Sequence, residues 1–284
     1  MEYGRLYQKG KEILEEAGVP EAKLDARLLL EYATGAERNT LYAHPERMVE
    51  AEKAAEYEAY LAKRAERIPL AYITGWQSFM GLDFSVNENV LIPRQDTEIL
   101  VEEVLKEPFD GSRILDICTG SGCILLSLLH YSNDCTGIGT DLSKGAIEVA
   151  RKNAGLLSLK EHALFLESDL AERAEDKFDI IVSNPPYIKT NVINELMPEV
   201  RDHEPFMALD GKDNGLYFYE EILKQTERLC RIGTRMYFEI GYDQGESVKS
   251  LMQQAGFSQV RVVQDYGGLD RVAAGIFAGE KKHV

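Results

Sequence analysis

From residue 111 onward, short apolar runs alternate with segments of helical periodicity. Strands are predicted at residues 113–117, 135–140, 162–168, 178–183, 234–240, 257–264 and 271–278. Helices are predicted between them at residues 121–131, 143–154, 216–231 and 243–255. This alternation predicts an α/β fold with a mostly parallel seven-stranded sheet and helices on both faces. The last two strands lie too close in sequence for a parallel crossover, so we expect an antiparallel pair at the sheet edge.

The N-terminal residues have helical periodicity. Leu24, Leu28 and Tyr32 recur four residues apart, and Gly35 suits a helix C-cap. A longer helix is predicted at about residues 46–66, closed by Pro69. One face of that helix is marked by Met48, Ala51, Ala55, Ala59 and Ala62.

Three segments are therefore expected: a helical domain (1–74), a β-hairpin linker (75–93) and a larger α/β domain (94–284). In the linker, apolar residues alternate with polar ones, and Asn87-Glu88-Asn89 is predicted to be the turn. Thr97 is predicted to cap a helix that runs to about Lys106.

Composition narrows the classes of function. The chain carries a net charge of −16, and residues 76–284 hold 21 basic against 34 acidic side chains. A domain with this much negative charge repels the phosphate backbone of a nucleic acid. We therefore expect no direct nucleic-acid partner. The four cysteines (Cys118, Cys123, Cys135, Cys230) form no C-x-x-C pair, and no metal site is expected. No stretch is apolar enough for a membrane span or a signal peptide, which predicts a cytoplasmic protein without a membrane partner.

The first chemical motif is the turn Asp116-Ile117-Cys118-Thr119-Gly120-Ser121-Gly122, directly after a predicted strand. A glycine turn between strand and helix lets a ligand approach the backbone closely, although an ordinary strand–helix turn has the same composition. Asp141 ends the next strand, where an acid can accept hydrogen bonds from both ribose hydroxyls of a nucleoside. The pair favours nucleoside binding over a plain turn.

The spacing of the glycines bears on which nucleoside is bound. Dinucleotide sites usually carry G-x-G-x-x-G, whereas this turn has G-x-G with Asp116 upstream. An acid at that position can meet a cationic amino group, such as that of a methionine moiety. We therefore favour S-adenosylmethionine, which would leave as S-adenosylhomocysteine. Asp169 lies where an adenine amino group could be bound, or it is a helix N-cap or a solvated loop acid.

The second motif is Asn184-Pro185-Pro186-Tyr187, just past a predicted central strand. Two prolines stiffen a loop at the carboxyl end of the strand, where open α/β sheets place their sites. The Asn184 carbonyl and nearby free backbone carbonyls can hold an NH₂ group and draw its lone pair out of conjugation. Tyr187 can stack on the planar group. The motif thus predicts alkylation of an amide or aryl amine, with a rigid structural turn as the alternative.

The chain resembles the bacterial release factor glutamine methyltransferases over essentially its full length. The resemblance rests on the helical N-terminal region and on Asn184–Tyr187. It rests further on Phe79-Met80-Gly81-Leu82-Asp83-Phe84, Leu91-Ile92-Pro93-Arg94 before Thr97-Glu98, Glu204-Pro205 and Ala208-Leu209. The Asn-Pro-Pro-Tyr motif is shared with DNA adenine methyltransferases, whereas the combination is specific.

The resemblance implies a Rossmann-like class I methyltransferase. Its implied substrate is the side-chain amide of the glutamine in the Gly-Gly-Gln motif of class 1 peptide chain release factors. It implies that Asn184 and Pro185 grip this amide, alongside Pro186 and Tyr187. Residues Cys118–Gly122, Asp141, Leu170 and Asn184 would line the cofactor site. The helical domain would contact the release factor away from the tripeptide.

The sequence departs from the family pattern in three places. Cys118 stands where glycine is expected, Gln95-Asp96 replaces Pro-Glu, and Leu170 replaces an aromatic residue. Three alternative functions stay open: a glutamine methyltransferase acting on a ribosomal protein, a nucleic-acid amine methyltransferase, and a non-catalytic nucleoside-binding module. The acidic charge argues against a nucleic-acid amine methyltransferase. A non-catalytic nucleoside-binding module would not need a group that binds an amide.

Overall fold

The computed structural model describes residues 1–279, which divide into two compact units. The first unit consists of Met1–Trp76 together with Met197–His203, and the second of Gln77–Leu196 together with the chain from Glu204 onward. The chain therefore passes between the units three times. Within the described residues, no helix is both long enough and apolar enough to cross a membrane.

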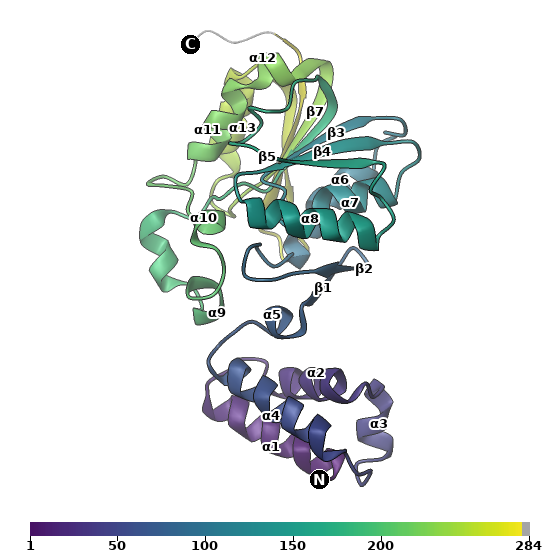
Figure 1. Ribbon diagram of the computed structural model, residues 1–284. Helices are drawn as coiled ribbons and strands as arrows, with labels where there is room; N and C mark the ends of the chain where they lie inside the picture. The colour runs from purple at the N-terminus through teal and green to yellow at the C-terminus, as the bar shows by residue number, and fades with distance from the viewer. Residues whose placement is uncertain (280–284) are drawn as a thin grey trace. The chain divides into compact units, whose positions relative to one another are not determined.

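The first unit is helical (Figure 1). Its helices are α1 (Tyr3–Glu16), α2 (Ala22–Thr34), α3 (Arg38–Ala43), α4 (Ala51–Ala65), α5 (Leu70–Thr74) and α9 (Pro198–Arg201). Gly35 ends α2 in the left-handed conformation at φ 67°, as the sequence predicts. Its backbone N–H donates to the Glu31 carbonyl at 2.8 Å, which satisfies one of the free carbonyls at the helix end.

The helix faces predicted from sequence are wrong in this unit. The alanine face of α4 is exposed, and the buried residues of that helix are Tyr57, Leu61 and Arg64. Large side chains bury more apolar area than alanines and so decide which face packs inward. Tyr57 lies in close contact with Gly10, where any Cβ would stand 1.9 Å from the phenol oxygen. On α2, Leu24 and Tyr32 are likewise exposed.

A buried charge network ties α9 to the other helices of this unit. Arg64 Nε donates to Asp25 at 2.8 Å, and Arg64 Nη2 donates to Glu199 at 2.9 Å. Arg67 donates to both carboxylate oxygens of Glu199, at 2.7 and 2.6 Å. Burial acts to raise the pKa of Glu199, but the hydrogen bonds from the two arginines outweigh it and lower the pKa to about 2. The segment 197–203 is thus an integral part of the helical unit.

The second unit is built on a seven-stranded sheet of order β5-β4-β3-β6-β7-β9-β8. Its strands are β3 (Arg113–Ile117), β4 (Thr136–Asp141), β5 (Ala163–Glu167), β6 (Phe178–Ser183), β7 (Cys230–Glu239), β8 (Phe257–Gln264) and β9 (Asp270–Phe277). The first five strands are parallel to one another, and β9 runs antiparallel to both β7 and β8. The predicted fold class, including the antiparallel edge, is confirmed.

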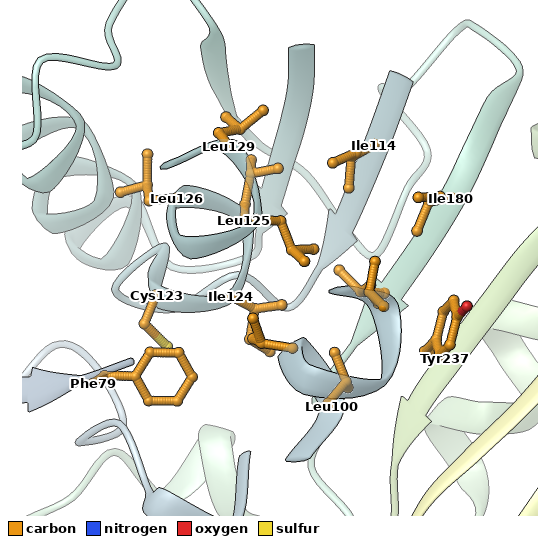
Figure 2. Packing of buried hydrophobic residues seen from close by; sticks show 14 of the residues in the cluster. Phe79, Leu100, Ile114, Cys123, Ile124, Leu125, Leu126, Leu129, Ile180 and Tyr237 are labelled. Atoms are coloured by element: carbon orange, nitrogen blue, oxygen red, sulfur yellow. The ribbon is translucent and has the colours of Figure 1, made fainter. Parts of the chain in front are cut away.

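Two apolar layers cover the two faces of the sheet. Alternate residues of one strand point to opposite faces, so Ile114 belongs to one core and Leu115 to the other. The Ile114 core is shown in Figure 2, where α6 and α7 side chains pack on β3, β6 and β7. The helices of this unit are α6 (Gln95–Leu105), α7 (Cys123–His130), α8 (Lys144–Leu156), η1 (Thr190–Glu195), α10 (Phe206–Leu209), α11 (Tyr217–Lys224), α12 (Thr226–Leu229) and α13 (Gly245–Gln254).

Three local predictions need correction. The hairpin strands are β1 (Trp76–Phe79) and β2 (Leu82–Ser85), so the turn is Met80-Gly81, with φ of 52° and 72°, and not Asn87-Glu88-Asn89. The helix predicted at 216–231 is two helices, and β7 already begins at Cys230. Thr97 does not cap α6, because that helix begins two residues earlier. Its side chain is free for another contact, described below.

Candidate active site

A cavity of about 250 Å³ opens at the carboxyl ends of β3, β4 and β6. Parallel strands bring their carboxyl ends to one edge of the sheet, so loops far apart in sequence meet there. Nine of the predicted site residues line the cavity: Cys118, Thr119, Gly120, Ser121, Asp141, Asp169, Leu170, Asn184 and Pro186. Four others do not line it: Asp116, Gly122, Pro185 and Tyr187.

The turn after β3 winds tightly through left-handed backbone. Cys118, Gly120 and Gly122 have φ of 63°, 55° and 80°. Apart from its two chain neighbours, no described residue has an atom within 4 Å of the position of a Cβ on Gly120, so its backbone is open to a ligand. At Gly122, a Cβ would stand 3.1–3.3 Å from Leu126, Ala150 and Phe165. Gly122 therefore serves close packing of helix on sheet and not ligand contact.

Asp141 is fixed beside this turn by backbone donors. Its Oδ2 accepts from the Gly120 N–H at 2.9 Å, and its Oδ1 accepts from the Ser143 N–H at 2.9 Å. Burial raises the pKa of Asp141, and these backbone hydrogen bonds oppose the rise. Each carboxylate oxygen keeps further acceptor capacity, which two vicinal hydroxyl groups can use.

Asp116 is fully buried beneath the turn. Its Oδ2 accepts from the Thr119 hydroxyl at 2.6 Å, and no described residue donates to its Oδ1. Burial raises the pKa of Asp116 to about 7, although the Thr119 hydroxyl acts against the rise. The geometry makes Asp116 a support for the turn, separated from the cavity by the residues that line it.

The loop after β6 presents Asn184 to the cavity. Its Nδ2 donates to the Thr97 hydroxyl oxygen at 3.3 Å, so the carboxamide oxygen is the end that remains for a ligand. Pro185 and Pro186 are buried, and the Tyr187 hydroxyl donates to Glu239 Oε1 at 3.2 Å. The structure thus brings the Asn184 oxygen, the predicted acceptor, to the cavity. It turns the Tyr187 ring, which was predicted to stack on the substrate, toward the protein.

The backbone of this loop is held in place by two glycines and a buried glutamine. Gln244 Nε2 donates to the Tyr187 carbonyl at 3.1 Å. A Cβ on Gly211 would lie 2.6 Å from Tyr187 backbone atoms, and one on Gly215 would lie 2.5 Å from the Tyr187 carbonyl oxygen. Only glycine fits at these two positions, because any larger side chain there would collide with the Tyr187 backbone and displace the loop.

Sequence reasoning missed three residues that line the cavity, Arg94, Phe206 and Met207, and the partner of the first, Glu204. Arg94 forms an ion pair with the buried Glu204, whose carboxylate also accepts from the Ile92 N–H at 3.4 Å. Phe206 and Met207 line the cavity and are about half exposed. The sequence did contain a signal for Arg94 and Glu204, because the segments 91–94 and 204–205 carry part of the family resemblance. An exposed Phe-Met pair has no comparable signal in one sequence.

Comparison with known proteins gives matches to both parts of the chain. Residues 5–75 match the family model "PrmC N-terminal domain", and residues 94–200 match "Methyltransferase small domain". A release factor glutamine methyltransferase from Caulobacter vibrioides is 42% identical over 96% of this chain and 95% of its own length. One from Geobacter sulfurreducens is 40% identical over 92% of each chain. A crystal structure of a methyltransferase from Pyrococcus furiosus shares the fold, with a TM-score of 0.53 at 15% identity, covering 79% of this chain and 99% of that one.

Proposed function

This chain belongs to the release factor glutamine methyltransferase family, and we propose that it methylates the side-chain amide of the glutamine in the Gly-Gly-Gln motif of class 1 peptide chain release factors. The observation that carries the proposal is the orientation of Asn184. Its amide nitrogen is engaged by Thr97, which leaves an acceptor oxygen at the cavity beside Pro186. An amide NH₂ group is the kind of substrate that needs such an acceptor.

We propose that S-adenosylmethionine occupies the cavity. The residues present fit a nucleoside: the open backbone of Gly120 allows close approach, and the Asp141 carboxylate is held beside it with free acceptor capacity. Asp169 and Leu170 would contact the adenine ring, the first through its amino group. When bound, the cofactor supplies a methyl group activated by a sulfonium. Because Asp116 does not line the cavity, it would support the turn that binds the methionine part and not contact the ammonium directly.

The residues act by positioning the substrate and by accepting hydrogen bonds. A planar amide nitrogen is a weak nucleophile, because its lone pair is delocalised into the carbonyl. The Asn184 oxygen holds one N–H, and a backbone carbonyl of the Pro185 region would hold the other. Both contacts strengthen as the nitrogen gains positive charge, so they lower the barrier to methyl transfer. The nitrogen then loses one proton and becomes a neutral N-methyl amide.

The test is methylation of a purified release factor with methyl-labelled cofactor, read by intact mass and by mapping of the modified peptide. Wild-type protein is expected to add one methyl group, on the glutamine of Gly-Gly-Gln. Asn184→Ala should lower the single-turnover rate about 10²–10³-fold, by analogy with the removal of one preorganised donor from an oxyanion hole. A substrate variant with alanine in place of the glutamine is the matched control.

Two results would contradict the proposal. One is labelling of purified ribosomal protein under the same conditions with no labelling of the release factor, which would assign the activity to the other substrate. The second is a near wild-type rate for Asn184→Ala, which would make the Asn-Pro-Pro-Tyr loop a structural turn. A release factor substrate would place the activity in the cytoplasm.

A further inference from the structure

Glu239 is a buried acid close to the Asn-Pro-Pro-Tyr loop that the proposed mechanism does not use. It is the last residue of β7, only 2% exposed. Strand β7 is parallel to β6, and the register pairs Phe238 with Ser183. Glu239 therefore lies one position past the last paired residues, next to the point where Asn184 leaves the sheet.

One oxygen of Glu239 holds the end of the loop. Its Oε1 accepts from the Tyr187 hydroxyl at 3.2 Å. Tyr187 is the last residue of the motif, and its carbonyl is fixed separately by Gln244. The hydrogen bond from the phenol also fixes the orientation of the Tyr187 ring, because the hydrogen bond to the Tyr187 carbonyl does not fix the side-chain torsions.

Thr97 contacts the start of the loop. Its hydroxyl accepts from Asn184 Nδ2 at 3.3 Å, and the residue is 2% exposed. An accepting hydroxyl needs an acceptor for its own hydrogen. The second oxygen of Glu239, Oε2, is buried and has no hydrogen-bond partner among the described residues. The Thr97 side chain opposes the rise in pKa that burial causes at Glu239, and a hydroxyl hydrogen turned toward Oε2 would satisfy both groups.

We propose that Glu239 is a positioning residue, which fixes the Asn184 carboxamide with its oxygen toward the cavity through the Thr97 hydroxyl and fixes the Tyr187 ring through its phenol. The two ends of a carboxamide are nearly equal in size, so packing alone does not choose between them. A wrongly turned Asn184 would present NH₂ to the substrate NH₂, and two donors cannot bind each other. The carboxylate removes this choice, because both of its oxygens accept and neither donates.

The proposal predicts a specific effect of Glu239→Gln, and it rests on the proposed methylation of an amide. A glutamine at this position can accept at one end only, so it can serve Tyr187 or Thr97 but not both. We expect kcat to fall about 10–100-fold, by analogy with the removal of residues that orient the ligands of a metal ion. The KM for the cofactor should stay within about twofold, since neither partner of Glu239 supplies the turn after β3.

Variants of Thr97 separate this relay from a general loss of packing. Thr97→Val keeps the shape and removes the hydroxyl, and it should lower kcat to a similar degree. Thr97→Ser restores the hydroxyl and should restore most of kcat. Because both residues act through one path, the double variant of Glu239→Gln and Thr97→Val should be no slower than the slower single variant, within about twofold.

Thr234→Val is the matched control. Thr234 is a buried threonine on β7 itself, near the opposite end of the strand, and its hydroxyl donates to the Phe178 carbonyl at 2.6 Å. Its replacement removes a buried hydroxyl from the same sheet, so it should lower the melting temperature. It should leave kcat unchanged, since it lies far from the loop.

A second measurement does not depend on the substrate. In ¹⁵N NMR spectra, the side-chain amide signal of Asn184 is assigned by its absence in Asn184→Ala. This signal should shift in Glu239→Gln and in Thr97→Val, and stay in place in Thr234→Val. The inference is overturned if the signal is unmoved in Glu239→Gln, if that variant keeps a wild-type kcat, or if the effects of Glu239→Gln and Thr97→Val multiply. Failure of wild-type protein to methylate a release factor would instead overturn the proposed function, and the NMR arm would still test the relay.

Discussion

Cys118 is a residue with a side chain at a backbone position that favours glycine. This predicts that Cys118→Gly is more stable than Cys118→Ala. At φ 63° a residue with a Cβ carries a strain of about 1–2 kcal/mol, which glycine does not. Glycine in turn loses more conformational entropy on folding than alanine, about 0.4–1 kcal/mol. The difference leaves Cys118→Gly more stable than Cys118→Ala by about 0.5–1 kcal/mol, because both variants lose the same thiol and the loss cancels.

Cys135 provides the comparison at an ordinary backbone position. It is 2% exposed and is not among the residues with positive φ. There Cys135→Ala should be more stable than Cys135→Gly by about 0.4–1 kcal/mol, so the order of the two variants reverses between the sites. In a domain of this size, 1 kcal/mol corresponds to about 2–4 °C in melting temperature. Differential scanning calorimetry can resolve that shift and can follow the second unit separately if the two units melt apart.

The reasoning is refuted if alanine is the more stable replacement at both cysteines. That result would mean that the turn after β3 relaxes around Cys118 at little cost. Cofactor titration of the same variants adds a functional readout. Cys118→Gly should bind S-adenosylmethionine at least as tightly as wild type, because the residue lines the cavity and a smaller side chain opens the backbone to the ligand.

Three further predictions concern single carboxyl groups. Asp141→Ala should weaken cofactor binding about tenfold or more through the lost charge-assisted hydrogen bonds, and an unchanged Kd in calorimetry would remove Asp141 from the site. Asp116 has a pKa near 7 when folded, against 3.8 when unfolded, so the stability that it contributes is present below about pH 4 and is lost as the pH rises through 7. Asp116→Asn should therefore gain melting temperature relative to wild type between pH 5 and 8, and a constant difference would contradict the raised pKa. Glu199 has a folded pKa of about 2, so its contribution is present above pH 4.5 and is lost as the pH falls toward 2. Glu199→Gln should destabilise the helical unit by about 3–5 kcal/mol at neutral pH in urea unfolding, because it leaves Arg64 and Arg67 short of a charged partner, and a loss below 1 kcal/mol would show that water replaces the carboxylate.

Local pattern was enough to predict much of the fold and part of the site. Strands such as 113–117 and 178–183 were predicted at their observed bounds, because apolar runs bounded by turns depend on neighbouring residues. The turn after β3 and the loop after β6 followed from the same strand ends. The hydrogen bonds of Thr97 with Asn184 and of Glu239 with Tyr187 could not be predicted, because they depend on where α6 begins and on the register of β7 against β6.

The helical region shows the opposite limit. Several periodic stripes coexist on α4, and the alanine stripe looked as regular as the one that is buried. Which stripe faces inward depends on Tyr57 meeting Gly10, a contact between helices that no local pattern contains. The short segment 197–203 carried no signal at all that it folds with residues more than a hundred positions away.

The three passages of the chain between the units limit how such a protein can be recombined. The helical unit is completed by residues 197–203, whose Glu199 is buried against Arg64 and Arg67. A chimaera that exchanges residues 1–76 between relatives would unite a foreign pair of arginines with the resident acid, or leave one of them alone. The helical unit is therefore inherited as two pieces, and any grafted version must bring its own 197–203 segment along.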